Sequence, residues 1–161
     1  MSQQATTTRR KKKAVATTME VCSVRLGRGV FGIPISRVLE IIGGAQPQHV
    51  PLAPGFVGGL VHYRGDVLTT VSLRQVLDMP PSDGRQDILV LDSPSGCFGI
   101  LVDSVGEVLR ISTAELEPNP STLDDSRRGL FTGACKLKDN LMVMLDPEKL
   151  DPVHLGAAQA A

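Results

Sequence analysis

The sequence Phe31-Gly32-Ile33-Pro34-Ile35-Ser36-Arg37-Val38-Leu39-Glu40-Ile41-Ile42 occurs a second time, in altered form, from Phe98 to Leu109. Phe, Gly, Ile, Val and Glu keep the same positions in both copies, and the numbering offset between the copies is constant (98 minus 31 is 67). We call this the first offset. A match of this length at one offset indicates an internal duplication, which determines how the rest of the chain is interpreted.

A second match extends the duplication. Gly59 to Leu73 aligns with Gly133 to Pro147 at a second offset (133 minus 59 is 74), which places Arg64-Gly65-Asp66 on Lys138-Asp139-Asn140. The difference of seven between the two offsets falls in the polar loop before Leu130. The apolar runs are short, rich in Val, Ile and Leu, and separated by turn residues. Each half supplies about five strands, so the sequence predicts an all-β fold of two small, five-stranded, SH3-like β-barrels.

The expected elements follow from the apolar runs and the turns between them. The predicted strands cover residues 19–26, 30–35, 56–63, 67–73, 87–91, 97–102, 105–111, 130–137 and 141–145, and residues 36–42 form a helical turn that leads into a strand. Short helical segments are expected at 73–77 and 146–150, the second with Asp146 as N-cap and Pro147 at its first position. We expect a disordered basic tail over residues 1–18, a folded domain over 19–152 with its two lobes joined near 78–86, and a C-terminal tail over 153–161 whose Ala-rich end is frayed from Gly156.

Composition narrows the possible partners. Hydrophobic residues make up 42% of the chain and aromatic residues only 3%, with no Trp. So few aromatic residues argue against modules that stack nucleic-acid bases on aromatic platforms. Five basic residues lie at positions 9–13, so the rest of the chain carries 12 basic (17 minus 5) against 17 acidic side chains, a net charge of about −5. We therefore expect no nucleic-acid binding.

The sequence shows neither a bilayer-spanning apolar run nor a secretory signal. We expect a cytoplasmic protein without direct membrane insertion.

The chemical motifs of enzymes and metal sites are missing. The three histidines have no ligand spacing, and we expect Cys22, Cys97 and Cys135 to be buried, reduced thiols. No nucleophile motif, phosphate loop or dinucleotide fingerprint occurs. Asp92 and Asp103 lie in sequences that approach an aspartic-protease motif, but both motifs lack the glycine and do not occupy matching places in the two halves. We predict no catalytic residue, no cofactor and no metal, with a β-barrel enzyme using Asp92 and Asp103 as the alternative.

The order of several short motifs resembles the CheW coupling-protein domain of bacterial chemotaxis over residues 20–152. The matching segments are Phe31-Gly32-Ile33, Val38-Leu39-Glu40-Ile41, Val50-Pro51-Leu52-Ala53-Pro54, Gly59-Leu60-Val61-His62-Tyr63-Arg64-Gly65, Leu73-Arg74, Gly99-Ile100-Leu101-Val102-Asp103-Ser104-Val105 and Leu145-Asp146. The resemblance implies two five-stranded barrels and a non-enzymatic adaptor. Its implied partners are the cytoplasmic tip of a chemoreceptor and the regulatory domain of a CheA-type histidine kinase, itself similar in fold. A scaffold of a twitching or other non-motility pathway is the alternative within this family.

The resemblance also implies which residues meet these partners. Val38 and Glu40 fall on the family's Val-x-Glu segment, and Arg64 and Gly65 on its Arg-Gly turn. The residues alone leave two interpretations of Arg64 open, a solvated side chain on an ordinary hairpin turn or a contact residue. The two halves differ at this turn, where Arg64-Gly65 aligns with Lys138-Asp139, and such differences are where partner specificity is expected.

Overall fold

The computed structural model describes residues 17–119 and 129–160, and in these residues the chain is mostly β. The strands are β1 (Thr18–Leu26), β2 (Gly29–Pro34), β3 (Val38–Ala45), β4 (Val57–Tyr63), β5 (Asp66–Ser72), β6 (Gln86–Leu91), β7 (Phe98–Val102), β8 (Ser104–Ser112), β9 (Phe131–Lys136) and β10 (Leu141–Leu145). The helical segments are η1 (Ile35–Arg37), α2 (Leu73–Val76), η2 (Thr113–Glu115), η3 (Pro147–Leu150) and α4 (Pro152–Ala160).

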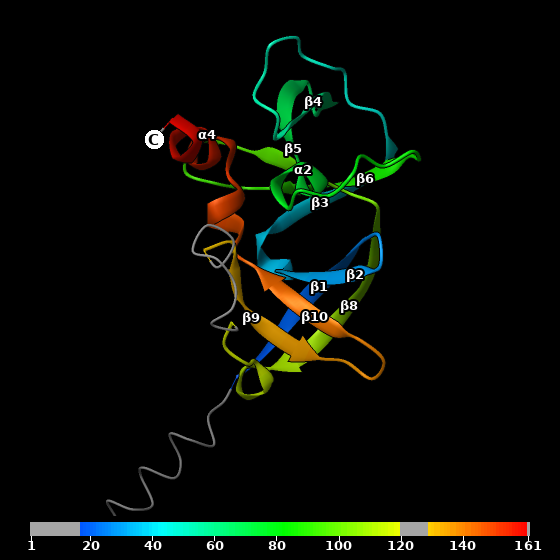
Figure 1. The fold of residues 1–161 in the computed structure, drawn as a ribbon, viewed down its shortest axis with the longest axis vertical. Coiled ribbons are helices and arrows are strands. Elements are labelled where there is room, and N and C mark those ends of the chain that lie inside the picture. The colour runs from blue at the N-terminus through cyan, green and yellow to red at the C-terminus, as the bar shows by residue number, and fades with distance from the viewer. Residues whose placement is uncertain (1–16, 120–128, 161) are drawn as a thin grey trace, which may run out of the picture.

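The strands form two five-stranded mixed sheets. The first lobe has the strand order β8-β1-β2-β10-β9, and the second lobe has the order β3-β6-β7-β5-β4. Each sheet contains one parallel pair, β2 with β10 and β5 with β7. Figure 1 shows the first lobe in the lower part of the molecule and the second above it, with α4 beside the second lobe. The predicted all-β fold with two five-stranded units is confirmed.

The two lobes are not consecutive halves of the chain. Each lobe takes two strands from one half of the duplication and three from the other: β1 and β2 join β8, β9 and β10, while β6 and β7 join β3, β4 and β5. The chain passes between the lobes at η1 and again at Asp103. The junction expected near residues 78–86 lies instead inside the second lobe, between α2 and β6. A repeat shows which strands are equivalent, but it does not show which copy a strand pairs with.

The duplication is visible in the strand register. Val24 pairs with Phe31 in the first lobe, and Leu91 pairs with Phe98 in the second, so the two pairs are related by the first offset. The edge strands β8 and β3 also match, because each ladder has a register shift at the equivalent place. That shift lies between Cys22 and Val24 in the pairing of β1 with β8, and between Val38 and Glu40 in the pairing of β3 with β6. The two lobes are therefore copies of one strand arrangement, built with exchanged strands.

The same equivalence holds for two glycines. Gly59 and Gly133 are related by the second offset, and both have positive φ, 128° and 149°. A Cβ atom on Gly59 would lie 2.5 Å from the Gln48 carbonyl oxygen, and one on Gly133 would lie 2.6 Å from the Glu117 carbonyl oxygen. In each lobe a loop segment thus approaches the sheet closely only because glycine is present.

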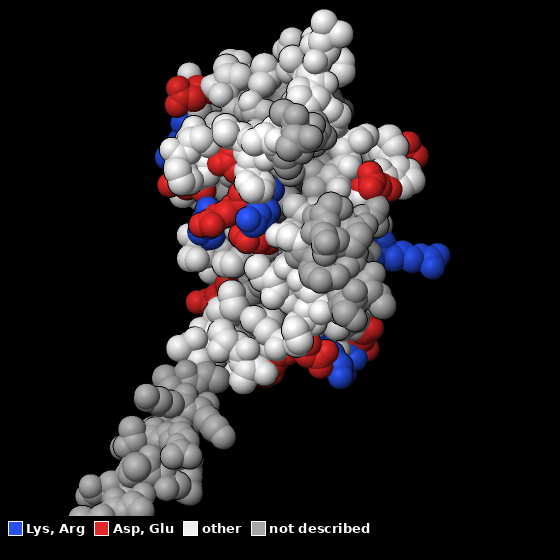
Figure 2. Space-filling model, turned by 60° about the vertical axis from the view of Figure 1, so that its left-hand side comes forward, with Lys and Arg blue, Asp and Glu red and all other residues white. Residues whose placement is uncertain are grey.

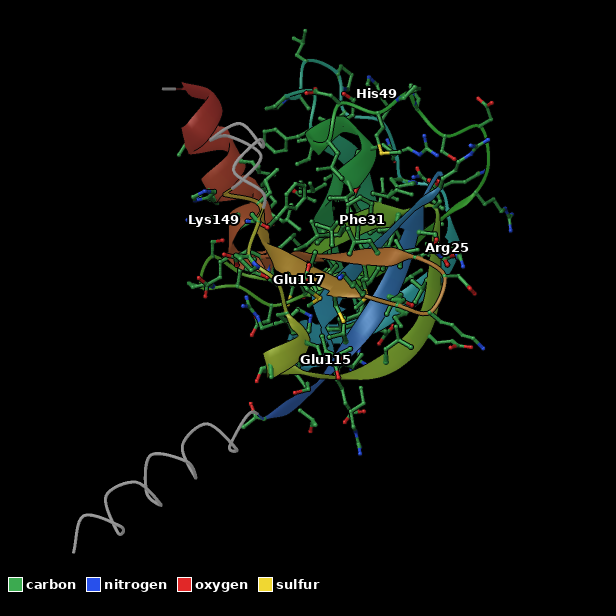
Figure 3. The ribbon with its side chains drawn as sticks, turned by 60° about the horizontal axis from the view of Figure 1, so that its bottom comes forward. Arg25, Phe31, His49, Glu115, Glu117 and Lys149 are labelled. Atoms are coloured by element: carbon green, nitrogen blue, oxygen red, sulfur yellow. The ribbon has the colours of Figure 1, made fainter. Side chains whose placement is uncertain are left out.

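A shared apolar core joins the lobes. It contains Cys22, Val24 and Ile33 from the first lobe and their equivalents Leu89, Leu91 and Ile100 from the second, all buried. Figure 3 shows Phe31 among the side chains that fill the centre of the molecule, where it packs against this core. Each lobe also has a smaller core of its own. The two lobes therefore bury part of their apolar surface against each other.

The C-terminal part of the described chain agrees with expectation only in part. Asp146 caps η3 as predicted, because its carboxylate accepts a hydrogen bond from the Glu148 amide. Over residues 153–161, where we expected a C-terminal tail frayed from Gly156, the described residues form α4 (Pro152–Ala160), whose Leu155 packs against the shared core. The basic segment at positions 9–13 lies outside the described residues. Within the described ranges, no helix is long and apolar enough to cross a bilayer.

Candidate partner-binding surface

The hairpin between β4 and β5 presents Arg64. Tyr63 pairs with Asp66, so the connection is the two-residue turn Arg64-Gly65, with Asp66 already part of β5. Both turn residues have positive φ, 51° for Arg64 and 82° for Gly65. A type I′ hairpin turn requires positive φ at both positions, which glycine adopts freely and arginine only under strain. The backbone thus holds the arginine side chain outward at the tip of the hairpin.

Arg64 forms an ion pair with Glu40. Its Nη2 lies 2.8 Å from Glu40 Oε1, and the Arg64 Cζ atom lies 5.4 Å from the centre of the Tyr63 ring. Glu40 belongs to β3 and Arg64 follows β4, which are the two edge strands of the second lobe. The structure therefore brings together two of the predicted site residues, and it does so across the two edges of one sheet. The Arg64 side chain keeps 72% of its surface exposed.

The sequence neighbours of Glu40 on β3 are exposed apolar side chains. Leu39 and Ile41 are 51% and 44% exposed, while Val38 and Glu40 alternate with them and are half-buried. Val67, the second residue of β5, is 58% exposed. Because β3 is an edge strand, its outer backbone groups are not paired within the sheet. We call Glu40, Ile41, Arg64 and Val67 the β3 surface; Leu39 lines the groove described below.

The first lobe repeats the apolar part of this surface. Val108 and Leu141 occupy the positions of Ile41 and Val67, and they are 49% and 51% exposed. The charged part is not repeated. The ion pairs among the described residues are Arg37–Glu148, Arg64–Glu40, Arg74–Asp103 and Lys136–Glu117, and Glu107 and Lys138, which match Glu40 and Arg64, take part in none of them.

These exposed aliphatic pairs were not predicted from the sequence, although the two repeat offsets relate their members. An apolar residue that recurs at a surface position in both halves was a usable signal. We did not use this signal, because the alternation of side chains along a strand does not show which face of the sheet is covered and which is exposed.

A groove lies where η1, the β6–β7 turn and the η3–α4 segment meet. It consists of two adjoining cavities of about 440 Å³ and 420 Å³ that share Ser93 and Pro94. Arg37 donates to the Asp92 carbonyl oxygen at 3.1 Å and lies 3.8 Å from Glu148, so charged groups line the wall of the groove beside the exposed Leu39.

Figure 2 shows one face of the molecule, on which acidic and basic side chains lie side by side in a small group and large areas carry neither.

The acids considered for an enzyme do not form a catalytic pair. Asp103 is occupied by a bidentate ion pair with Arg74, and hydrogen bonds from that guanidinium hold the pKa of the Asp103 carboxyl below its ordinary value. Asp92 lines one of the groove cavities, and Asp103 is not among the residues that line it. In the part of the chain that the structure describes, no cluster of three or more His, Cys, Asp and Glu side chains has the arrangement of a metal site.

The cysteines match expectation only in part. Cys22 and Cys135 are buried free thiols, and burial raises the pKa of each. Cys97, which we expected to be buried beside Phe98, is exposed. The strand β7 begins at Phe98, so Cys97 still belongs to the turn and its side chain is not directed into the core.

Comparison with known proteins shows the family of the chain and agrees with its fold. Residues 20–152 match the family model described as the CheW-like domain. The chain is 28% identical to the chemotaxis protein CheW of Rhizobium meliloti, over 83% of this chain and 87% of that protein, and 30% identical to that of Helicobacter pylori, over 78% and 76%. The crystal structure of the scaffolding protein TtCheW from Thermoanaerobacter tengcongensis superposes with a TM-score of 0.74 at 20% identity, covering 83% of this chain and 88% of that one.

Proposed function

The chain belongs to the CheW-like domain family and is a non-enzymatic chemotaxis scaffold, and on this premise we propose which surfaces meet which partners. The β3 surface binds the regulatory domain of a CheA-type histidine kinase, and the groove at η1 binds the cytoplasmic tip of a chemoreceptor. The protein acts in the cytoplasm, at receptor arrays that are held at the membrane by the receptors and not by insertion of this chain.

The Arg64–Glu40 pair carries the proposal for the kinase. The guanidinium of Arg64 is mostly exposed and held by a 2.8 Å contact to Glu40, and Ile41 on β3 and Val67 on β5 are exposed apolar residues of the same lobe, so the lobe offers both a directional charge and apolar side chains. Such a combination suits a protein partner that supplies a carboxylate and a complementary apolar edge. The edge strand β3 adds backbone groups that a second sheet can pair with. A kinase domain of similar fold would present an equivalent edge.

The shape of the groove supports the proposal for the receptor. Its two cavities adjoin through Ser93 and Pro94, and their lining mixes Leu39 and Val153 with Arg37 and Glu148. An amphipathic helix binds to a groove of this kind through apolar anchors spaced one turn apart and through charges on its flanks. Glu40 and Leu39 are neighbours on β3, so the two proposed sites adjoin.

Titration calorimetry with each partner fragment from the same organism tests the proposal. We expect both the kinase regulatory domain and the receptor tip to bind the full chain at micromolar concentrations or below, and to bind together without competing. Absence of binding by either fragment up to about 100 μM would overturn the assignment of that partner. Competition between the two fragments would contradict separate sites.

A further inference from the structure

Asp103 is the point at which the chain passes back from the second lobe to the first. Its amide donates to the Arg25 carbonyl oxygen of β1 at 3.0 Å, and its Oδ2 accepts from the Gly27 amide in the β1–β2 turn at 2.7 Å. Both contacts reach into the first lobe, although Asp103 directly follows β7 of the second lobe. The residue therefore holds the start of β8 against β1 at the crossing.

Arg74 binds the same carboxylate from the other side. It lies on α2 of the second lobe and donates from Nε to Asp103 Oδ1 at 2.7 Å and from Nη2 to Oδ2 at 2.5 Å. Its Nη1 donates to the Pro80 carbonyl oxygen at 2.6 Å, in the loop after α2. The two side chains are only 14% and 22% exposed. One carboxylate thus receives two donors from α2 and one from the turn of the opposite lobe.

This ion pair supplies a property that the shared core lacks. Apolar contacts between the lobes, such as those of Val24 and Leu91, hold the lobes together but are non-directional, and packed layers can slide by small amounts. A bidentate arginine–carboxylate pair is directional, because two parallel hydrogen bonds fix both position and angle. The core therefore provides cohesion between the lobes, and the ion pair is placed to fix their orientation.

The duplication offers a matched control at the other crossing. Glu148 occupies the position of Arg74 at the second offset, and it pairs with Arg37 beside the first crossing. The distance is 3.8 Å, and the Glu148 side chain is 73% exposed. The charges are reversed and the geometry is loose, so this second pair contributes little orientation.

We propose that the Arg74–Asp103 ion pair is a positioning device that sets the orientation of the two lobes, and with it the geometry in which the chain presents its two partners to each other. This inference rests on the proposed function, because orientation has a consequence only for a protein that holds two partners at once. Arg74 and Asp103 are positioning residues, since they belong neither to the β3 surface nor to the lining of the groove.

Residual dipolar couplings of the strand amides test the structural part without any partner. In the wild-type protein, couplings from both lobes should fit one alignment tensor. In Arg74→Gln, and in the milder Arg74→Lys, which keeps the charge and loses the bidentate contact, each lobe should still fit alone while the joint fit fails. Arg37→Gln should behave as wild type. A joint fit of unchanged quality in both Arg74 variants would overturn the proposal.

A reconstituted receptor–kinase assay tests the functional part. We expect each Arg74 variant to bind the separate kinase domain and receptor tip within about twofold of wild type, while receptor-dependent stimulation of the kinase falls about tenfold. Full stimulation with Arg74→Lys and Arg74→Gln would overturn the proposal and leave the proposed function standing. Failure of the wild-type chain to bind the fragments would instead overturn the proposed function, and the dipolar couplings would still decide whether the pair orients the lobes.

Discussion

The guanidinium of Arg64 and the carboxylate of Glu40 lie 2.8 Å apart and thereby connect the two edge strands of the second lobe. Both residues have an aligned counterpart in the other half of the chain: Glu40 aligns with Glu107 and Arg64 with Lys138. The equivalent residues of the first lobe, Lys138 and Glu107, are absent from the ion pairs of the described residues. The second lobe thus carries a charge arrangement that the described residues of the first lobe do not repeat.

Arg64→Glu should weaken binding of the kinase domain by about tenfold or more while the protein stays folded. The substitution reverses an exposed charge at a turn, and loss of an exposed, solvent-screened ion pair changes the free energy of unfolding little. Titration calorimetry and thermal unfolding measure the two effects. Lys138→Glu, at the equivalent turn of the first lobe, is the control and should bind as wild type; a loss of equal size there would show a general charge effect.

The charge-swapped double variant, Arg64→Glu with Glu40→Arg, should not recover kinase binding. The Arg64 side chain is 72% exposed although it contacts Glu40, so a carboxylate of the partner can reach its guanidinium. In the double variant the guanidinium lies on β3 and no longer at the tip of the hairpin. A double-mutant cycle by calorimetry measures the coupling between the two positions. Recovery to wild-type affinity would mean that only the internal ion pair matters.

Gly59→Ala and Gly133→Ala should each destabilise the fold by about 1–3 kcal/mol, and by similar amounts. Both glycines have positive φ and face a backbone carbonyl oxygen where a Cβ would lie, so neither site relaxes by moving a flexible side chain. Urea unfolding measures the change. Gly84→Ala, where a Cβ meets nothing within 4 Å, is the control, and an equal loss there would contradict the steric account.

Acid should destabilise the protein partly through Asp103. The hydrogen bonds from Arg74 hold the pKa of the Asp103 carboxyl below its ordinary value of 3.8, against the opposing effect of partial burial. Because the pKa of this carboxyl is lower in the folded state than in the unfolded state, its ionised form stabilises the fold above about pH 3.8. This stabilisation is lost as the pH falls through the lower pKa of the folded state.

The free energy of unfolding should therefore fall less steeply between about pH 4 and about pH 2 in Asp103→Asn than in wild type. Arg74→Gln should flatten the slope in the same way, because it removes the partner that lowers the pKa. Urea titrations at a series of pH values measure the slopes. Identical slopes in all three proteins would show that this carboxylate does not contribute.

Native protein should react with a thiol reagent such as Ellman's reagent at one site. Cys97 is exposed, whereas Cys22 and Cys135 are buried and have raised thiol pKa values, which reduces the thiolate fraction that reacts. All three thiols should react in urea. The Cys97→Ser variant should show almost no rapid reaction, and rapid labelling that persists in it would contradict the burial of the other two.

Several features were predictable from local sequence. The hairpin turn at Arg64-Gly65, the cap at Asp146 and the strand around Glu40 each depend on neighbouring residues, and the structure has all three. The burial of Cys97 was predicted wrongly, because one residue of error at a strand boundary moves a side chain from the core to a turn.

The sequence by itself determined that the fold is duplicated, that it is built of short strands, and which positions of the two halves correspond. Only the tertiary structure decided that three strands of each half are exchanged between the lobes, and that Arg64 meets Glu40 and Arg74 meets Asp103. The reason is physical: periodicity and turn chemistry act between neighbours, whereas strand partners and ion pairs depend on which distant segments share a core. Two equivalent copies satisfy the local rules equally well whether their strands pair within a half or across it.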